Sequence, residues 1–348
     1  MRRLTATTAA ATATALAALC LAACGTTHSA ADAADAAGDE APSAGSSAQG
    51  GTGKAAGPVT LTDASGTRVH LDAPATRVVG TEWNVVEDLV TLGVDPVGVA
   101  DVKGYTAWDT AAPLRSSAKD IGTRGEPSMD TVAALAPDLV VATTDLSASA
   151  VAQLRKIAPV VEVRSADAAD QIGLMTTDLD LIAKATGTER KAAAVKQAFD
   201  AKLASGRKAL ADAGLAGAPY AFADGYVQAN QVAVRPYTSG SLIGAVNERI
   251  GLKNAWKVAG DKAYGLATTD VEGLTGLGDV RFAYIANDAD GDPFTTALAK
   301  NAVWRSLPFV AAGHVSRLPD GVWMFGGPAS MGAYVDSVVA ALTKSPAK

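Results

Sequence analysis

Short apolar segments of the buried-strand type occur in two blocks of this sequence, separated by a long stretch that contains none. The first block has such segments at 77–80, 96–100, 138–142 and 159–163, and the second at 220–225, 231–235, 281–286 and 314–318. Helical patterns lie between the first four, with apolar residues recurring on one face: Val85, Val86, Leu89 and Leu92, and later Val132, Leu135 and Leu154. Alternating strands and helices predict an α/β fold with a largely parallel sheet.

The stretch between the blocks has a helical pattern throughout. Apolar residues recur at spacings of three and four from Ile172 to Ile182, Gly187 interrupts them, and the pattern resumes from Val195 to Leu210. This predicts two long consecutive helices with no strand between them. Residues 59–71 alternate apolar and polar around a turn and predict an N-terminal hairpin. The chain is therefore expected to fold as a lobe, a helical connector and a second lobe.

The first residues are typical of an exported chain. Arg2 and Arg3 precede an uncharged Ala/Thr/Leu stretch that ends in LAAC, residues 21–24, which predicts a signal peptide over 1–23. LAAC followed by glycine resembles the bacterial lipobox, which implies cleavage before Cys24 and acylation of its thiol. Residues 24–58 are poor in large apolar groups, so we expect a lipidated cysteine on a disordered tether.

Cysteine content, net charge and the length of apolar stretches argue against several kinds of site and partner. The remaining cysteine, Cys20, would leave with the signal peptide, so no disulfide or cysteine-based metal site is expected. The formal net charge is −6, and removing Arg2 and Arg3 makes it −8, which argues against a nucleic-acid partner. No later stretch is long and apolar enough to cross a bilayer. Residues 59–348 suffice for one large or two linked domains.

A faint internal repeat supports two equivalent lobes. In each block a candidate helix N-cap, Ser128 or Asp270, is followed two residues later by an acid, Asp130 or Glu272. A leucine comes five residues after each acid, and a predicted strand follows it. Both lobes are therefore expected to use the same helix-to-strand unit, with an acid in the same place.

Four segments carry a resemblance to a known family. They are RVVGTEWNVVEDLVTLGVDPVGVAD, GTRGEPSMD, SLIGAVNERIGLKNAW and WRSLPFVAAGHVSRLPDGVWMFGGP. Over nearly all of residues 59–345 the chain resembles the ferric-siderophore-binding lipoproteins of bacterial ABC importers, which include the ferric hydroxamate- and iron dicitrate-binding proteins. The resemblance implies the type III substrate-binding fold of helical-backbone metal receptors, in which two lobes, each with a mostly parallel sheet flanked by helices, are joined by one long spine helix.

On this resemblance we expect an N-terminal lobe at 59–167, a spine helix at 168–186 and a C-terminal lobe at 187–348. Ligand would lie in the cleft between the lobes, and the protein would be a carrier with no enzymatic activity and no cofactor. It would be a monomer on the outer face of the cytoplasmic membrane, attached only by the lipid on Cys24. It would deliver a ferric siderophore to an ABC permease dimer.

Arg124 stands in the turn GTRGEP, where hydroxamate-binding relatives direct an arginine at the oxygens around the iron. A guanidinium offers several donors in a fixed fork, which suits the negatively polarised oxygens of a siderophore. The alternative is a surface arginine that balances Glu126. Those relatives also have a tyrosine in the loop after the strand DLVVATT, whereas this chain has Thr144 to Ser147, so a close copy of hydroxamate chemistry is in doubt.

The other candidate ligand-binding residues are aromatic or cationic. Several of them lie in loops after predicted strands, where α/β sheets bind ligands, and the resemblance implies that Trp108, Tyr264 and Trp323 match aromatic positions that face the cleft. Arg235 would be a second cation opposite Arg124. For Trp83, a cleft-lining and a core position are equally open, while Trp256 and Trp304 are expected in the core. The candidates besides the two arginines are Trp83, Tyr105, Trp108, Tyr226, Tyr237, Tyr264 and Trp323.

Asp130 and Glu272 have a different expected role. In the family, an acid on each lobe meets arginines of the permease, and these two occupy the matching positions. The alternative is that each acid only stabilises the positive end of its helix.

The sequence bears on four other functions: a metal-ion receptor, a haem or cobalamin receptor, an enzyme and a scaffold protein. A receptor for bare zinc or manganese needs several converging His and carboxylate ligands, and the folded part has only His70 and His314, far apart in sequence, so no metal site is expected. A haem or cobalamin receptor of the same fold stays an alternative, with Tyr105 or Tyr226 as a candidate axial ligand of haem. No nucleophile elbow, phosphate loop or dinucleotide fingerprint indicates an enzyme. A lipid-anchored scaffold without a small ligand is the remaining alternative.

Overall fold

The computed structural model describes residues 57–229 and 231–343. Cys24, the predicted signal peptide and nearly all of the predicted tether lie outside the described residues. Within the described part, no helix combines the length and apolarity that a bilayer span requires.

The N-terminal part of the described chain contains the predicted hairpin and the first predicted sheet. β1 (Val59–Thr62) pairs antiparallel with β2 (Arg68–Leu71). A separate sheet of five strands is parallel throughout, as predicted. In spatial order its strands are β5 (Lys119–Asp120), β4 (Gly98–Val99), β3 (Val78–Gly80), β8 (Leu139–Thr143) and β9 (Val160–Val163). β5 was not predicted because its two exposed polar residues carry no apolar signal.

The helices of this lobe follow the predicted patterns. Val85, Val86 and Leu89 are fully buried on one face of α1, and Gly93 ends that helix in the left-handed conformation that glycine adopts without strain. The helices are α1 (Trp83–Leu92), α2 (Val102–Trp108), α3 (Met129–Ala134) and α4 (Ala148–Leu154).

The C-terminal lobe has a mixed, mostly parallel sheet in the order β11, β10, β13, β14, with β12 beside β10. Only β10 and β11 pair antiparallel, as a long hairpin. The strands are β10 (Pro219–Gln228), β11 (Gln231–Pro236), β12 (Lys253–Asn254), β13 (Arg281–Tyr284) and β14 (Val315–Arg317). The helices before the last one are α7 (Leu242–Arg249), η1 (Glu272–Leu277), α8 (Pro293–Thr296), η2 (Leu298–Lys300), α9 (Ala302–Ser306) and α10 (Pro308–Ala311).

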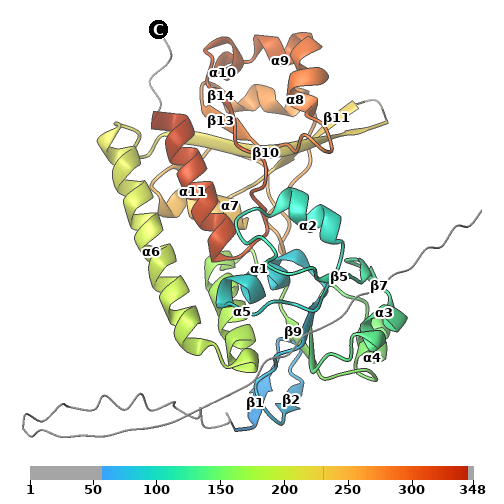
Figure 1. Cartoon of the computed structure of the whole chain (residues 1–348). Coiled ribbons are helices and arrows are strands. Elements are labelled where there is room, and N and C mark those ends of the chain that lie inside the picture. The colour runs from blue at the N-terminus through green and yellow to red at the C-terminus, as the bar shows by residue number, and fades with distance from the viewer. Residues whose placement is uncertain (1–56, 230, 344–348) are drawn as a thin grey trace, which may run out of the picture. The chain divides into compact units, whose positions relative to one another are not determined.

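Two consecutive helices join the sheets, as the sequence pattern predicts: α5 (Gln171–Thr186) and α6 (Glu189–Asp212). α5 begins three residues after the predicted start of the spine and contacts α1 of one lobe and α7 of the other. The longer α6 does the same, and Figure 1 shows it running beside both sheets. Its Ala192 packs in the core of the first lobe, while Leu210 packs with residues of the second.

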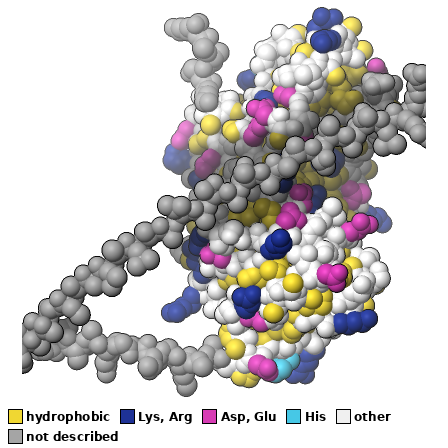
Figure 2. Space-filling view, turned by 45° about the vertical axis from the view of Figure 1, so that its right-hand side comes forward, with side chains coloured by type: hydrophobic (Ala, Val, Ile, Leu, Met, Phe, Trp, Pro, Cys, Tyr) yellow, Lys and Arg dark blue, Asp and Glu magenta, His cyan; other side chains and the backbone are white. Residues whose placement is uncertain are grey.

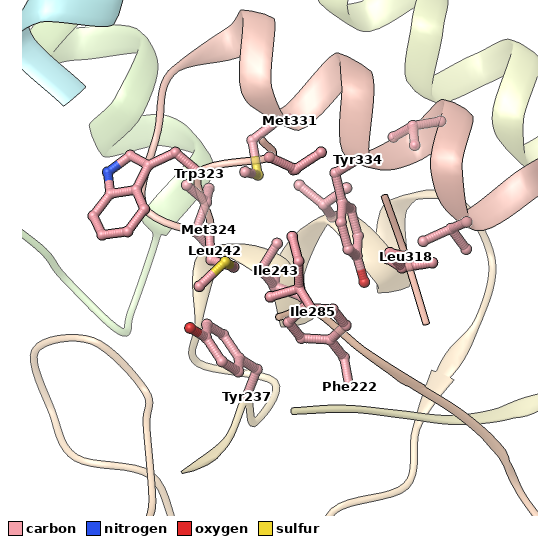
Figure 3. Close-up of a cluster of buried hydrophobic side chains, with 14 of the residues drawn as sticks. Phe222, Tyr237, Leu242, Ile243, Ile285, Leu318, Trp323, Met324, Met331 and Tyr334 are labelled. Atoms are coloured by element: carbon pink, nitrogen blue, oxygen red, sulfur yellow. The ribbon is translucent and has the colours of Figure 1, made fainter. Parts of the chain in front are cut away.

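The last helix, α11 (Pro328–Thr343), lies along α6 and also reaches α1. Met331 and Tyr334 project from it toward Phe222 and Ile285 in the buried cluster shown in Figure 3. These side chains attach the C-terminal helix to the second sheet.

The segment before α11 lies unusually close to α1. A Cβ atom on Gly326 would stand 2.1 Å from Glu87 Oε2, and one on Gly327 would stand 2.4 Å from Asp88 Oδ1. A side chain at either position would have to displace these carboxylate oxygens. The backbone N–H of Ser330, in the first turn of α11, donates to Glu87 Oε1 at 2.8 Å. A carboxylate is favourable at a helix N-terminus, so this contact binds the last helix to the first lobe.

Three carboxyl groups are buried at this contact: Glu87, Asp88 and Asp109, each at most 3% exposed. Burial raises the pKa of Asp109 well above its ordinary value, and the charge of Glu87 and a hydrogen bond with it raise that pKa further. Burial, followed by the charge of Glu87, likewise raises the pKa of Asp88. Protonated carboxyls avoid the cost of burying several like charges together.

The surface is mixed in charge. On the face shown in Figure 2, the described residues present acidic and basic side chains interspersed with apolar ones.

The Asp109→Asn substitution should flatten the dependence of stability on pH. Unfolded Asp109 loses its proton near pH 4 while the folded group keeps it, so the folded state binds more protons and its stability falls as pH rises through neutrality, by at most about 1.4 kcal/mol per pH unit. Asparagine retains an oxygen to accept from the N–H of Ala112 and cannot titrate. Thermal unfolding followed by circular dichroism between about pH 5 and pH 9 measures the effect.

The matched control is Asp336→Asn, which removes an exposed acid of α11 that pairs with Lys202. The control should keep the slope of the parent protein. Parallel stability curves for Asp109→Asn and the parent would contradict the assignment of a proton to Asp109.

Candidate functional site

A cavity of about 400 Å³ lies between the two lobes. The first lobe lines it from the carboxyl ends of three neighbouring strands, with residues just after β3, at the end of β8 and just after β9. Ligands bind at this edge of α/β sheets because the loops there diverge. The lining residues are Glu82, Asn84, Arg124, Thr143 and Ser165 from the first lobe, and Arg235, Tyr264, Leu266, Trp323 and Phe325 from the second.

Arg124 lies at the tip of a small hairpin formed by β6 (Gly122–Thr123) and β7 (Glu126–Pro127). Its Nη1 donates to Glu82 Oε1 at 2.7 Å, so its ion pair is with Glu82 and the alternative pairing with Glu126 is wrong. The guanidinium carbon lies 4.1 Å from the ring centre of Trp83 and 5.3 Å from that of Trp323. Two indole faces and one carboxylate therefore hold the cation at the cavity.

Arg235 lines the same cavity from the second lobe. It is directly opposite Asp224 in the β10–β11 ladder, and both its Nε, at 2.8 Å, and its Nη2 donate to that carboxylate. The buried hydroxyl of Tyr237 donates to Asp224 as well, at 3.3 Å. A bidentate cross-strand pair of this kind fixes the orientation of the guanidinium.

Aromatic rings form one wall of the cavity. Phe325 makes edge contacts with Trp323 and Tyr264, at centroid distances of 5.1 and 5.7 Å. Trp83 lies beneath them, 4% exposed, with its indole N–H donating to the carbonyl of Ala100 at 3.1 Å. Trp83 is thus a core residue that supports Arg124 and does not line the cavity.

Hydrogen bonds between the lobes flank the cavity. The hydroxyl of Tyr264 donates to Asp145 of the first lobe, and the indole N–H of Trp108 donates to Asp290 of the second at 2.8 Å. Burial, followed by the bond to Asp145, raises the pKa of Tyr264, so its hydroxyl stays protonated and remains a donor. Asp145 lies in the loop after β8, so a phenol reaches that loop from the other lobe.

A second cavity of about 510 Å³ adjoins the first, since Arg235 and Trp323 line both. Trp108 and Tyr226 line this second cavity, and Tyr226 is 45% exposed. The structure therefore places these two predicted residues beside the main cavity and not in it.

Tyr105 lines neither of these cavities, which corrects the prediction, whereas Tyr237 lines a smaller cavity of about 30 Å³ beside Ser165, Tyr264 and Phe325. Tyr105 is fully buried because KGYTAW forms helix α2, whose inner face it occupies, and its hydroxyl donates to the carbonyl of Ala112. Tyr237 packs edge-on against Phe222 at 5.1 Å, at the end of β11. Burial raises the pKa of both hydroxyls.

The repeated helix starts are present in both lobes. Ser128 Oγ accepts from the N–H three residues later at 3.3 Å, and Asp270 Oδ1 accepts from the N–H three residues later at 3.1 Å. Asp130 is exposed in the first turn of α3, and Glu272 is exposed at the start of η1, a 3₁₀ helix. The docking role of these two acids remains a prediction.

The remaining predicted residues fall into the core or the surface. Trp304 is buried, and Trp256 packs against the same core with its indole N–H donating to the carbonyl of Phe222, as predicted. His70 contacts Thr60 in the N-terminal hairpin, whereas His314 contacts Asp279 in the other lobe. Over residues 57–229 and 231–343, no group of three or more His, Cys, Asp or Glu side chains is arranged so that it could hold a metal ion.

Sequence reasoning missed several residues that line the main cavity. Their signal was position, because Glu82, Thr143 and Ser165 all follow predicted strands closely. Polar residues at the ends of strands are common and so are a weaker signal of a binding site than aromatic ones. The missed residues are Glu82, Asn84, Thr143, Ser165, Leu266 and Phe325.

Comparisons with known proteins agree with this architecture. The chain is 26% identical over 250 residues to the iron(3+)-hydroxamate-binding protein FhuD of Escherichia coli K12, covering 72% of this chain and 81% of that protein. It is 25% identical over 288 residues to the probable siderophore-binding lipoprotein YfiY of Bacillus subtilis, covering 77% and 82%.

Solved structures show the same fold. The Fe3+–Desferal-bound siderophore-binding protein FhuD from Vibrio cholerae superposes with a TM-score of 0.70 and 27% identity, covering 77% of this chain and 98% of that one. The triscatecholate siderophore-binding protein FeuA from Bacillus subtilis gives a TM-score of 0.67 at 18% identity, covering 82% and 98%.

The periplasmic binding protein family matches residues 78–321. The chain therefore belongs to this family of two-lobed, non-enzymatic substrate-binding proteins of ABC importers.

Proposed function

We propose that this protein captures a ferric siderophore in the cavity between its lobes and delivers it to an ABC permease dimer for iron uptake. The observation that carries the proposal is the convergence of Arg124 and Arg235, one from each lobe, on a single cavity with an aromatic wall. Guanidinium groups suit the polarised oxygens around chelated iron, and the rings suit the carbon framework of the chelator. The names of the relatives FhuD and YfiY support this ligand class.

The haem alternative loses one of its two candidate ligands. Tyr105 is fully buried and cannot reach an iron atom in the cavity. Of the two adjoining cavities, Tyr226 lines the second and not the main one. We therefore favour iron that arrives already wrapped in its chelator, with no protein atom bound to the metal.

The proposal includes the attachment of the protein. Residues 1–23 would be removed as a signal peptide, Cys24 would carry the lipid, and residues 24–58 would tether a monomer to the outer face of the cytoplasmic membrane. Two of the relatives from Bacillus subtilis, YhfQ and YfiY, are named lipoproteins, which supports this placement. The lobes would be residues 59–167 and 187–348, with 168–186 as the spine.

Replacing Arg124 with alanine should weaken ferric-siderophore binding by roughly tenfold or more, because one charge-assisted contact is worth about 1.5–3 kcal/mol. Tryptophan-fluorescence quenching measures the affinity, with a panel of iron-loaded and iron-free siderophores, haem and cobalamin. Arg68→Ala, at an exposed position of the N-terminal hairpin, is the control and should leave affinity unchanged. Equal affinity of Arg124→Ala and the parent would remove Arg124 from the site.

Replacing both Asp130 and Glu272 with alanine should abolish uptake of the ferric siderophore while leaving binding intact, since both acids are exposed and lie outside the cavity. Uptake of labelled iron by cells and binding by the purified variant give the two measurements. A double variant of Glu189 and Asp336, exposed acids on α6 and α11, controls for the loss of two charges. Normal uptake by the Asp130/Glu272 variant would refute the docking role.

A further inference from the structure

Each guanidinium that lines the main cavity has a carboxylate of its own. Arg124 Nη1 lies 2.7 Å from Glu82, and Arg235 is held by both oxygens of Asp224, whose side chain is 9% exposed. A binding site for a strongly anionic ligand gains by leaving its cations unneutralised. In this cavity, a carboxylate neutralises each of the two cations.

The charges can be counted from the described side chains. The charged residues that line the main cavity are Arg124, Arg235 and Glu82, and Asp224 lies directly behind Arg235. Two positive and two negative charges give a formal sum of zero. The cavity therefore offers fixed donors to an oxygen-rich ligand without a net positive charge to balance an anionic one.

The adjoining cavity is more acidic. Its charged lining residues are Asp224, Asp290, Asp292 and Arg235, which sum to −2, although Asp292 also lies 3.2 Å from Arg317. The carboxylate of Asp290 accepts from the neutral indole of Trp108. A part of the ligand that extends past Arg235 and Trp323 therefore meets carboxylates, which favour a neutral or cationic group.

Iron(III) siderophores differ in net charge according to their donor groups. Three hydroxamates carry one negative charge each and leave the iron complex neutral, and a pendant ammonium makes it cationic. Three catecholates carry two each and leave the complex with three negative charges. Burying that excess without compensating cations costs the desolvation of the charge, and nearby carboxylates add repulsion.

We propose that Glu82 is a specificity-determining residue which, together with Asp224, keeps the cavity near neutrality and so selects ferric chelates of zero or positive net charge over anionic ones. This inference rests on the proposed function, because it assigns the charge class of the same ligand. It distinguishes this chain from a general receptor for ferric siderophores.

Glu82 is the residue to test because its contacts survive an isosteric change. Its Oε1 accepts from Arg124 and from the backbone N–H of Trp83, and the carbonyl oxygen of glutamine can accept both bonds. Asp224 is less suitable, since it also anchors the buried Tyr237. Glu82→Gln thus removes one negative charge with little change of shape.

The experiment measures, by tryptophan quenching, the affinity of a neutral ferric trihydroxamate and of a ferric tris-catecholate for the parent, Glu82→Gln and Glu126→Gln. We expect the parent to bind the neutral chelate at least roughly tenfold more tightly than the tris-catecholate. In Glu82→Gln this ratio of affinities should fall by at least about fivefold. Glu126 is an exposed acid on the hairpin that carries Arg124, so Glu126→Gln makes the same chemical change outside the cavity and should keep the preference of the parent.

The outcomes separate this inference from the proposed function. Equal affinity of the parent for both chelates, or the same preference in all three proteins, overturns the role of Glu82 while ferric-siderophore binding stands. Binding of neither chelate overturns both. Should Glu82→Gln unfold, Glu82→Ser removes the same charge and retains an oxygen at the N-cap of α1. The affinities of Glu82→Ser for the two chelates are then compared with those of the parent in the same way.

Discussion

The close contact between the segment Gly326–Gly327 and the buried carboxyls of α1 underlies the geometry of the site. Glycine allows the backbone to approach Glu87 and Asp88, and the first turn of α11 then donates the backbone N–H of Ser330 to Glu87. Trp323 and Phe325 directly precede this segment, so the same contact that joins the lobes also positions the aromatic wall of the cavity. A buried polar contact therefore holds the segment that follows the aromatic wall of the cavity.

The two arginines are held by different means in the two lobes. Arg124 stands on a short hairpin and depends on Glu82 and on two indole rings, whereas Arg235 is fixed by a carboxylate on the neighbouring strand. Both arrangements spend no ligand-binding energy on ordering a long flexible side chain. Each arrangement also neutralises its cation. The guanidinium groups can therefore donate directed hydrogen bonds to a ligand without giving the site a net positive charge.

Much of the fold could be predicted because strand and helix alternation follows from the period of apolar residues. Strands with no apolar signal, such as Lys119–Asp120, could not be predicted in this way. Tyr105 shows a similar limit: it follows a predicted strand, but the stretch around it forms a helix that turns the ring into the core. Position relative to strand ends would have pointed to Glu82 and Thr143, since loops at that edge line the cavity.

The sequence by itself determined the two α/β lobes, the two helices between them, the family, and the arginine-bearing turn that faces the cleft, because these depend on local periodicity and on short motifs. Only the tertiary structure decided which aromatic residues line the cavity and which acid pairs with each guanidinium. Those pairings join residues that are far apart in the chain, such as Glu82 with Arg124. The direction in which a side chain points is fixed only when the helices and strands pack together.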